Sequence, residues 1–307
     1  MPVIGHEKIA SFFAKVIAKN AFSQSYCFVG SDGVGKKTMA RYLATQILKI
    51  SDKQLDTHPD FYYISRQVDE KTEKIKKDIG ISQIRKIKER LGRKSWFGGY
   101  QIIIIDEAEL LNEESANALL KSLEEAGQEK VFFLLTTDDN QLLATIRSRC
   151  QMFYFSLTDI KTIESGLQSL GFSSTLAVES AKLSWGRPGR AVALATDDSL
   201  RENFNAEVER WQKISGEPFY KKIKAIEDLF NEKTDNLRTS EKLSNALETW
   251  AVLWREKILE KIDKPNENKG LSLLEMVALI DDFKKSQVLL AQNINPRLVM
   301  EQILLKV

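Results

Sequence analysis

The stretch 30–38, Gly-Ser-Asp-Gly-Val-Gly-Lys-Lys-Thr, has the residue types and spacing of a loop that binds phosphate. Its three glycines let backbone N–H groups converge on phosphate oxygens, and Lys36 supplies a cation for the β and γ phosphates. The motif places a serine or threonine after this lysine to bind Mg²⁺, but here the residue is Lys37, and Thr38 comes about 100° further around the helix. We therefore expect a loop suited to phosphate and poorly suited to the metal. The candidate phosphate-binding residues are Gly30, Gly33, Gly35, Lys36, Lys37 and Thr38.

Two carboxylates, Asp106 and Glu107, directly follow a run of four isoleucines at 102–105. Such a run indicates a strand buried on both faces, as in a parallel sheet. The acids would then lie at the carboxyl edge of the sheet, where open α/β sheets bind ligands. In P-loop ATPases the first acid helps to hold Mg²⁺ and the second polarises the attacking water. Asp106 and Glu107 are therefore the candidate catalytic pair.

Hydroxyls and arginines accompany the next two predicted strands. The run 131–137 ends in two threonines, and Thr137 lies where a residue that senses the γ-phosphate would be expected. Arg147 and Arg149 come just before the predicted strand 151–155. Alternatively, these threonines and arginines are ordinary loop and surface residues. Thr137 and Arg149 are candidates because of the order in which their segments follow one another.

Residues 66–94 are the most basic part of the chain, with eleven Lys and Arg against five acids. Isoleucines and a leucine recur at helical spacing from Ile81 to Leu91, which predicts an amphipathic helix over 81–94 with a basic outer face. A run of charge is more often a solvated helix face, and the functional alternative is a patch that contacts the phosphates of DNA. The candidate DNA-binding residues are Arg85, Lys86, Lys88, Arg90 and Arg93.

The 307 residues that surround these groups suggest two or three domains. A hydrophobic content of 43% and a charged content of 29% are typical of a globular protein, and the net charge of +2 is too small to argue for nucleic-acid binding by itself. Cys27 and Cys150 are expected to be reduced core residues, and with only two histidines no metal-binding cluster is expected. Neither a signal segment nor a membrane-spanning stretch is evident, so we expect a cytoplasmic protein without a membrane partner.

Strand and helix patterns alternate up to about residue 157 and then give way to helices alone. This order predicts an α/β fold with a P-loop domain at 1–157, a small helical domain at 158–204 and an all-helical domain at 205–307. A polar loop at 263–270 separates two of the last helices.

Several segments together resemble the bacterial clamp-loader subunits of the AAA+ superfamily. The specific ones are Asn-Ala-Leu-Leu-Lys-Ser-Leu-Glu-Glu at 117–125 and Ser-Arg-Cys at 148–150, since the phosphate loop alone would admit many families. The resemblance extends over nearly the whole chain, from residue 4 onward. The other matching segments are His-Pro-Asp at 58–60, Asp-Glu-Ala-Glu at 106–109 and Asn-Ile-Asn-Pro-Arg-Leu at 293–298.

The resemblance implies a RecA-like AAA+ domain, a helical lid and a helical collar that assembles a pentameric ring. In that family the ring contains gamma/tau and delta subunits and loads the sliding clamp onto primed DNA. Each ATP lies between two subunits, and the arginine of Ser-Arg-Cys reaches the γ-phosphate of the neighbour's ATP. Arg149 occupies that position here and would act in trans as an arginine finger, whose planar cation stabilises the transferring phosphoryl group.

Departures from the family pattern point to the type of subunit. ATP-hydrolysing members carry an arginine three residues after the glycine of the lid, which here is Gly186, yet this chain has Gly189 there and Arg190 one residue later. Together with Lys37 and the retained Arg149, this pattern favours the delta-prime type, which donates a finger without a complete site of its own. The intact Asp106-Glu107 pair argues the other way, so binding of ATP by the chain's own loop is left open.

Two alternatives remain at this point. The first is an ATP-hydrolysing gamma/tau-type subunit that uses Thr38 and Arg190, although the sequence ends soon after Asn-Pro-Arg-Leu, without the long tail of the tau type. The second is a P-loop kinase of small molecules, which would need neither Ser-Arg-Cys nor about a hundred helical residues after the lid. No zinc is expected, because residues 51–57 lack the cysteines that many bacterial members carry there.

Overall fold

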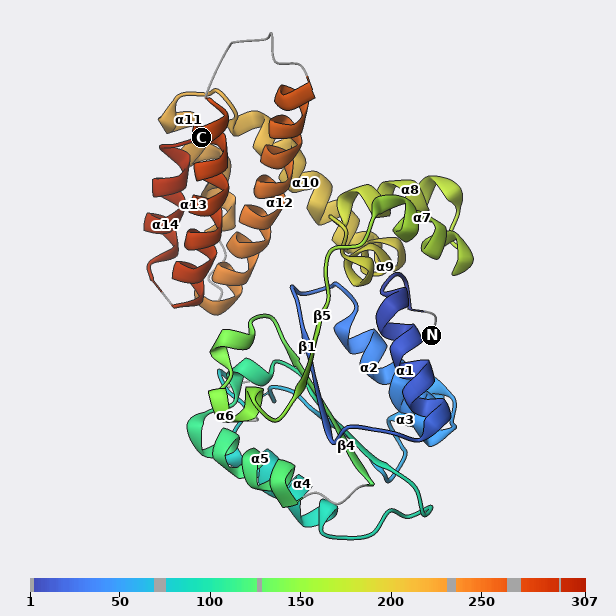
Figure 1. Cartoon of the computed structure of the whole chain (residues 1–307). Helices are drawn as coiled ribbons and strands as arrows, with labels where there is room; N and C mark the ends of the chain where they lie inside the picture. Colours follow the sequence, from blue (N-terminus) through green and yellow to red (C-terminus); the bar gives the residue numbers. More distant parts are fainter. Residues whose placement is uncertain (1–2, 69–75, 126–128, 231–235, 264–271, 293) are drawn as a thin grey trace. The chain divides into compact units, whose positions relative to one another are not determined.

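The chain divides into two compact units, Met1–Thr196 and Asp197–Val307, which are drawn in Figure 1. Part of the basic segment (69–75) and Asn293 lie outside the described residues. The computed structural model describes residues 3–68, 76–125, 129–230, 236–263, 272–292 and 294–307.

The first unit is built on a five-stranded sheet with the strand order β2-β3-β4-β1-β5. Every strand pairing in it is parallel, so the carboxyl ends of all five strands meet at one edge. The run of isoleucines forms β3, and it is fully buried, as expected for a strand covered on both faces. The strands are β1 (Ser25–Val29), β2 (Phe61–Ile64), β3 (Gln101–Ile105), β4 (Lys130–Thr136) and β5 (Gln151–Tyr154).

Helices cover both faces of this sheet (Figure 1). Alternate side chains of a strand belong to the cores on opposite faces. In β1, for example, Tyr26 and Phe28 pack against α1 and α2, whereas Cys27 and Val29 pack on the side of α4 and α5. The first layer contains α1 (Glu7–Lys19), α2 (Lys36–Leu48) and α3 (Asp52–Leu55). The second layer contains α4 (Ile81–Leu91), α5 (Glu113–Glu125) and α6 (Ala144–Arg147).

Three short helices complete the first unit and enclose a small core of their own. This core takes in Ile4 from the start of the chain, which packs so closely that a Cβ on Gly166 would lie 2.7 Å from its side chain. The N-terminal segment therefore fixes these helices beside the sheet. They are α7 (Ile160–Ser169), α8 (Ser174–Leu183) and α9 (Pro188–Thr196).

In the described part of the second unit the regular elements are all helices, and Trp211 is buried in its core. The indole of Trp211 contacts those of Trp250 and Trp254, with ring centroids 5.6 and 5.8 Å away. The predicted fold class is confirmed, while the boundaries at 157 and 204 stay a prediction. The helices are α10 (Asp198–Ile214), α11 (Phe219–Ile226), α12 (Asn236–Asp263), α13 (Leu273–Ala291) and α14 (Pro296–Leu304).

Candidate functional site

The predicted phosphate loop connects the end of β1 to the first residue of α2, Lys36. Gly33 and Gly35 adopt φ values of 76° and 106°, which are strained for a residue with a side chain. Their conformation turns the chain sharply enough for α2 to start at the carboxyl edge of the sheet. The first N–H groups of an α-helix have no acceptor within the helix, so this edge offers donors to an anion. Gly30 begins the loop, and Thr38 lies half-buried in the first turn of α2.

The side chain of Lys36 is folded into the loop and only 7% of the residue is exposed. Its ammonium donates hydrogen bonds to the carbonyl oxygens of Gly30 and Ser31, the latter at 3.1 Å. The carboxylate of Asp32 lies 3.8 Å away. Burial lowers the pKa of Lys36, because the charged form loses water that these partners only partly replace. The cation is thus held where phosphates would enter the loop.

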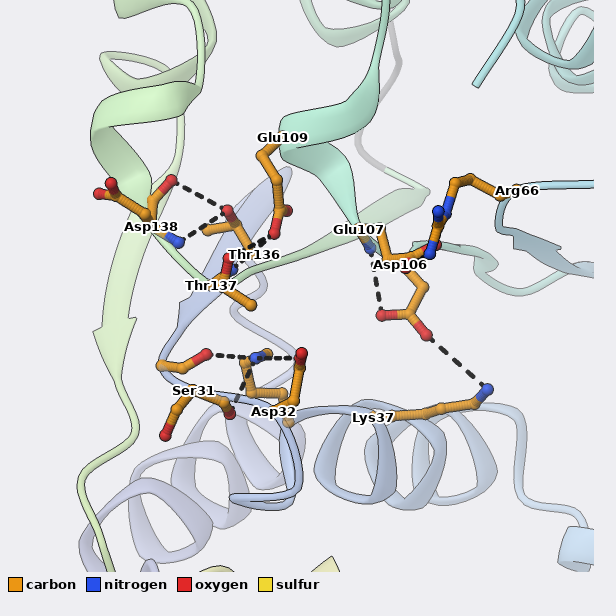
Figure 2. Close-up of polar contacts among 12 residues, drawn as sticks. Ser31, Asp32, Lys37, Arg66, Asp106, Glu107, Glu109, Thr136, Thr137 and Asp138 are labelled. Carbon is orange, nitrogen blue, oxygen red and sulfur yellow. Dashed lines mark hydrogen bonds and ion pairs between the residues drawn. The ribbon is translucent and has the colours of Figure 1, made fainter. Parts of the chain in front are cut away.

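Lys37 extends from α2 to the carboxylate of Asp106 at the end of β3, as Figure 2 shows. Its Nζ lies 3.7 Å from Asp106 Oδ2 and 4.5 Å from the centre of the Tyr63 ring. The Tyr63 hydroxyl donates a 2.5 Å hydrogen bond to the same Oδ2. Burial and the adjacent carboxylate raise the pKa of Tyr63, so its phenol keeps the proton that it donates. Asp106 therefore has a hydroxyl and an ammonium as partners.

Glu107 is held by Arg66, which follows β2. The guanidinium donates two parallel hydrogen bonds, from Nε to Oε2 at 2.8 Å and from Nη2 to Oε1 at 2.5 Å. This bidentate geometry is the strong form of a carboxylate–arginine pair. Glu107 also has a φ of 53°, uncommon for a residue with a side chain. Both oxygens of the predicted water-polarising carboxylate are thus engaged within the chain.

This donor set does not fit a magnesium ion, which the P-loop pattern implies. Mg²⁺ requires oxygen ligands around it, and in P-loop proteins these include the hydroxyl after the lysine and a carboxylate at the end of another strand of the sheet. Here the first position is Lys37, whose ammonium extends to the second, Asp106. A cationic side chain in that place would repel the ion.

Thr137, the predicted sensor, follows β4 and contacts Glu109 (Figure 2). Its Oγ1 donates to Glu109 Oε1 at 2.6 Å, and its backbone N–H donates to the same oxygen at 3.0 Å. The other oxygen of Glu109, Oε2, is buried and has no hydrogen-bond partner. Thr137 therefore lies at the same edge as the loop, with its hydroxyl directed to a carboxylate.

The start of α9 packs directly on the phosphate loop. The backbone N–H of Gly189 donates to the carbonyl oxygen of Gly33 at 2.7 Å. A Cβ on Gly189 would lie only 2.9 Å from that oxygen, so a side chain there requires the helix to move. Arg190 lies beside Gly33 as well, with its backbone N and Cβ 3.4 Å from the place of a Cβ on that glycine. The structure thus brings Arg190 to the loop.

Arg149 lies at the opposite, amino edge of the sheet, between α6 and β5. Its carbonyl oxygen accepts a 2.6 Å hydrogen bond from the buried hydroxyl of Ser25 at the start of β1, which fixes the backbone. Its guanidinium contacts Glu124 Oε1 at 2.5 Å and the Thr145 carbonyl oxygen at 3.0 Å. The two charged side chains are 40% and 51% exposed, so the arginine remains within reach of solvent.

The basic helix is α4, which ends at Leu91 rather than at residue 94. Gly92 follows it, and the predicted helix was therefore too long, with Arg93 beyond its end. The candidate DNA-binding side chains are nevertheless all exposed, while Ile84 and Leu91 are buried against the sheet. These exposed residues are Arg85, Lys86, Lys88, Arg90 and Arg93.

Two exposed aromatic residues, Trp96 and Phe97, follow this helix. They are 74% and 75% exposed, which is unusual for side chains of their size. The backbone N–H of Trp96 is held by the buried carboxylate of Asp60, at 3.0 and 3.1 Å from its two oxygens. The pair is therefore presented on an anchored segment.

Sequence reasoning missed three residues of the carboxyl edge, namely Tyr63, Arg66 and Glu109. Each lies just after a strand, or at its end, at the edge where ligands bind in parallel sheets. That position is the signal that could have found them, since polar residues at strand ends of one edge converge. Their partners depend on the strand order, which the sequence does not state.

Both cysteines are unpaired thiols in the structure. Burial raises the pKa of Cys150 to about 11 and that of Cys27 further, so both stay protonated at neutral pH. Within the described ranges, no three or more His, Cys, Asp and Glu side chains gather as a metal-binding group. Nor does any described helix combine the length and apolar character needed to cross a bilayer.

The first half of the chain matches a known family. Residues 5–159 match the sequence model of the family described as "DNA polymerase III, delta subunit". Over 147 residues the chain is 35% identical to DNA polymerase III subunit delta' of Escherichia coli K12, covering 48% of this chain and 42% of that protein. Over 186 residues it is 30% identical to the delta' subunit of Haemophilus influenzae, covering 56% and 53% respectively.

More distant similarity extends further along the chain. DNA polymerase III subunit tau of Escherichia coli K12 is 27% identical over 210 residues, which cover 65% of this chain and 31% of that protein. The chain thus spans about half or less of the length of the curated relatives that it matches. A crystal structure of a DNA polymerase III gamma subunit-related protein from Thermotoga maritima superposes with a TM-score of 0.52, covering 95% of this chain and 97% of that one. At 18% identity that likeness concerns the fold alone.

Proposed function

The chain belongs to the family of DNA polymerase III delta subunits, and on that premise we propose that it acts as a delta-prime-like subunit of a bacterial clamp loader. In this role it joins gamma/tau and delta subunits in a pentameric ring, which loads the sliding clamp onto primed DNA in the cytoplasm. Its own contribution to the chemistry is Arg149, which completes the ATP site of a neighbouring subunit.

The observation that carries this proposal is the contrast between Arg149 and the chain's own loop. Arg149 is anchored through its backbone by Ser25 and keeps a guanidinium that is 40% exposed. The carboxylates Asp106 and Glu107, by contrast, are each engaged within the chain. A subunit of this design can supply a cation to a neighbour, while its own two carboxylates are occupied by side chains rather than by a metal ion and a water.

The test is ATP turnover by the assembled loader that contains the Arg149→Ala variant. Loss of an arginine finger lowers turnover at the affected site by about 10³-fold in phosphoryl-transfer enzymes. The substitution should leave the subunit folded and able to join the ring, as size-exclusion chromatography would report. Only the turnover that depends on the adjacent site is expected to disappear.

Arg147→Ala is the matched control, because Arg147 is equally exposed and lies two residues away, paired with Asp139. Its turnover should stay close to that of the unchanged loader. Full activity of Arg149→Ala, or an equal loss in both variants, would reject the finger.

A hydrolysing gamma/tau-type role and a kinase role predict different results. If the chain were itself an ATPase, DNA-stimulated turnover would persist after the phosphate-loop lysines of all its partners are substituted. We expect no such turnover, since Lys37 and Arg66 occupy the carboxylates that hydrolysis requires. Transfer of phosphate to a small acceptor, measured directly, would instead support the kinase.

We further propose that α4 contacts DNA in the assembled loader. Its exposed basic side chains suit phosphates, and the adjacent Trp96 and Phe97 could stack on unpaired bases. Neutralising Arg85, Lys86 and Arg90 together should lower the slope of log affinity against log salt by about 2 to 3. Exchange of Lys15, Lys19 and Lys53 for glutamine is the charge-matched control. An unchanged slope would identify α4 as a solvated surface.

A further inference from the structure

The phosphate loop keeps its phosphate-binding parts while the place of its metal is taken by a side chain. Gly33 and Gly35 retain the turn, and Lys36 is buried inside it. Lys37 begins where the metal-binding hydroxyl would stand and ends 3.7 Å from Asp106, the carboxylate that would face the metal. The side chain therefore bridges the two positions between which a magnesium ion would be bound (Figure 2).

An ammonium group can do part of what the ion does at that point. It has three N–H donors, and its 3.7 Å ion pair with Asp106 is longer than a hydrogen bond, so these donors can turn to phosphate oxygens. Lys37 is 54% exposed and has a flexible stem, and its cation is therefore open to a ligand that enters the loop. Tyr63 donates a 2.5 Å hydrogen bond to the same oxygen of Asp106, which keeps the carboxylate in place as the anchor of the ammonium.

Charge balance supports the same conclusion. The phosphates of a nucleotide need cations, and the loop offers Lys36 and Lys37 before any metal is added. The second carboxylate that would attract an ion, Glu107, is already neutralised by the bidentate pair with Arg66. A magnesium–nucleotide complex would bring a further cation to within contact of the Lys37 ammonium, and this repulsion disfavours it.

We propose that Lys37 substitutes for the magnesium ion, so that this loop binds nucleoside polyphosphates in their metal-free form. This inference rests on the proposed function in one respect, namely that the loop is a nucleotide site of an AAA+ subunit. The bound nucleotide is held and not hydrolysed, and Lys37 and Asp106 serve as its permanent counter-charges. Nucleotide binding is thereby uncoupled from the metal that the hydrolysing sites of the ring require.

The test is calorimetric titration of the purified chain with ADP, once in EDTA and once in excess magnesium chloride. The unchanged chain should bind ADP more tightly in EDTA. In magnesium chloride most of the ADP is present as its magnesium complex, which the Lys37 ammonium repels. Lys37→Thr restores the hydroxyl and removes the ammonium. It should lose about tenfold or more in affinity in EDTA and regain that affinity in magnesium, a reversal of the preference worth at least about 1.4 kcal/mol.

Two controls assign the effect to the loop and to this lysine. Lys36→Met should abolish binding under both conditions, since it removes the cation buried inside the loop. Lys15→Thr makes the same exchange on the exposed face of α1 and should behave as the unchanged chain does. Circular dichroism of each variant would verify that the fold is retained.

Three results would overturn the inference. They are tighter ADP binding by the unchanged chain in magnesium, equal affinities of Lys37→Thr and the unchanged chain in EDTA, and absence of binding under both conditions. The proposed function fails separately, because it is tested by Arg149→Ala in the assembled ring. Loss of the finger with retained metal-free binding, or the reverse, is therefore a distinguishable outcome.

Discussion

The charged groups at the carboxyl edge of the sheet are paired with one another, whereas Arg149 at the amino edge has a partner that is itself half exposed. Lys37 is bound to Asp106, and Arg66 holds Glu107 by two hydrogen bonds. Arg149 contacts Glu124, whose side chain is 51% exposed. Both edges belong to the same sheet, and their residues are of the same chemical types.

The difference lies in what each group must give up to meet a ligand. An exposed ion pair is worth only about 0 to 1 kcal/mol, so Arg149 can leave Glu124 for a phosphate at little cost. The pairs at the carboxyl edge involve second partners, such as Tyr63 on Asp106, and their rearrangement breaks several contacts together. The comparison therefore separates an arginine that can turn to an external ligand from two carboxylates that are engaged within the chain.

The contact between α9 and the phosphate loop gives the largest expected effect on stability. In Gly189→Ala the new Cβ would lie 2.9 Å from the Gly33 carbonyl oxygen, and helix α9 would have to shift. Overpacking of this kind costs about 1–3 kcal/mol, and we expect a loss of that size in the free energy of unfolding of the first unit. Fluorine NMR of labelled Trp96 and Trp185, which belong to that unit, would follow its denaturation by urea.

Gly80→Ala is the control for this loss, because a Cβ at that position meets nothing within 4 Å and its φ is −79°. It should change the free energy of unfolding by less than about 1 kcal/mol, because the entropic gain of alanine is opposed by its being a poorer N-cap residue than glycine. If Gly189→Ala were equally well tolerated, α9 would not pack tightly on the phosphate loop. The groups at the carboxyl edge would then be less constrained by contacts within the chain.

Glu124→Gln tests the amino edge, with a smaller effect. Removing the carboxylate charge releases the guanidinium of Arg149, and stability should change by less than about 1 kcal/mol because the pair is exposed. Turnover at the neighbouring site should rise by up to about fivefold, since the phosphate no longer competes with Glu124. Glu114→Gln, on the same helix, is the control and should leave turnover unchanged. A fall in turnover instead would mean that Glu124 positions the arginine.

The fold was predictable from the sequence because its strands are short apolar runs separated by helical patterns. Four isoleucines in a row can be accommodated only where both faces of a strand are covered, and β3 is buried throughout. The end of α4 was less predictable, because Arg93 and Lys94 continue its charge pattern while Gly92 stops the helix. A run of charged residues does not indicate where a helix ends, whereas a glycine is common at that place.

The residues of the site that belong to a motif could be named from the sequence. The contacts between side chains that follow different strands could not. The replacement of a hydroxyl by Lys37 is visible in the sequence and predicts a poor metal site. That Tyr63 donates to Asp106, and that Arg66 holds Glu107, follows from the adjacency of β2 and β3 in the sheet. Pairs between residues about forty positions apart depend on that strand order, which no local pattern encodes.

The smallest expected effect concerns the buried ammonium of Lys36, whose pKa is lowered by burial from the usual value of 10.5. Between the lowered pKa and 10.5 the unfolded chain binds more protons than the folded one, so this group adds stability as pH rises through that window and withdraws it as pH falls. The unfolding free energy of the unchanged chain should therefore increase with pH relative to that of Lys36→Met, and the difference should level off above 10.5.

Urea denaturation at a series of alkaline pH values, followed at the same two tryptophans, measures this difference. The exposed Lys15→Met, compared in the same way, should give a difference that does not change with pH. A pH-independent difference for Lys36→Met would mean that its ammonium is as well solvated as a surface lysine. Burial would then cost the Lys36 ammonium nothing. The charged groups of the carboxyl edge would in that case be as free to leave their partners as Arg149 is at the amino edge.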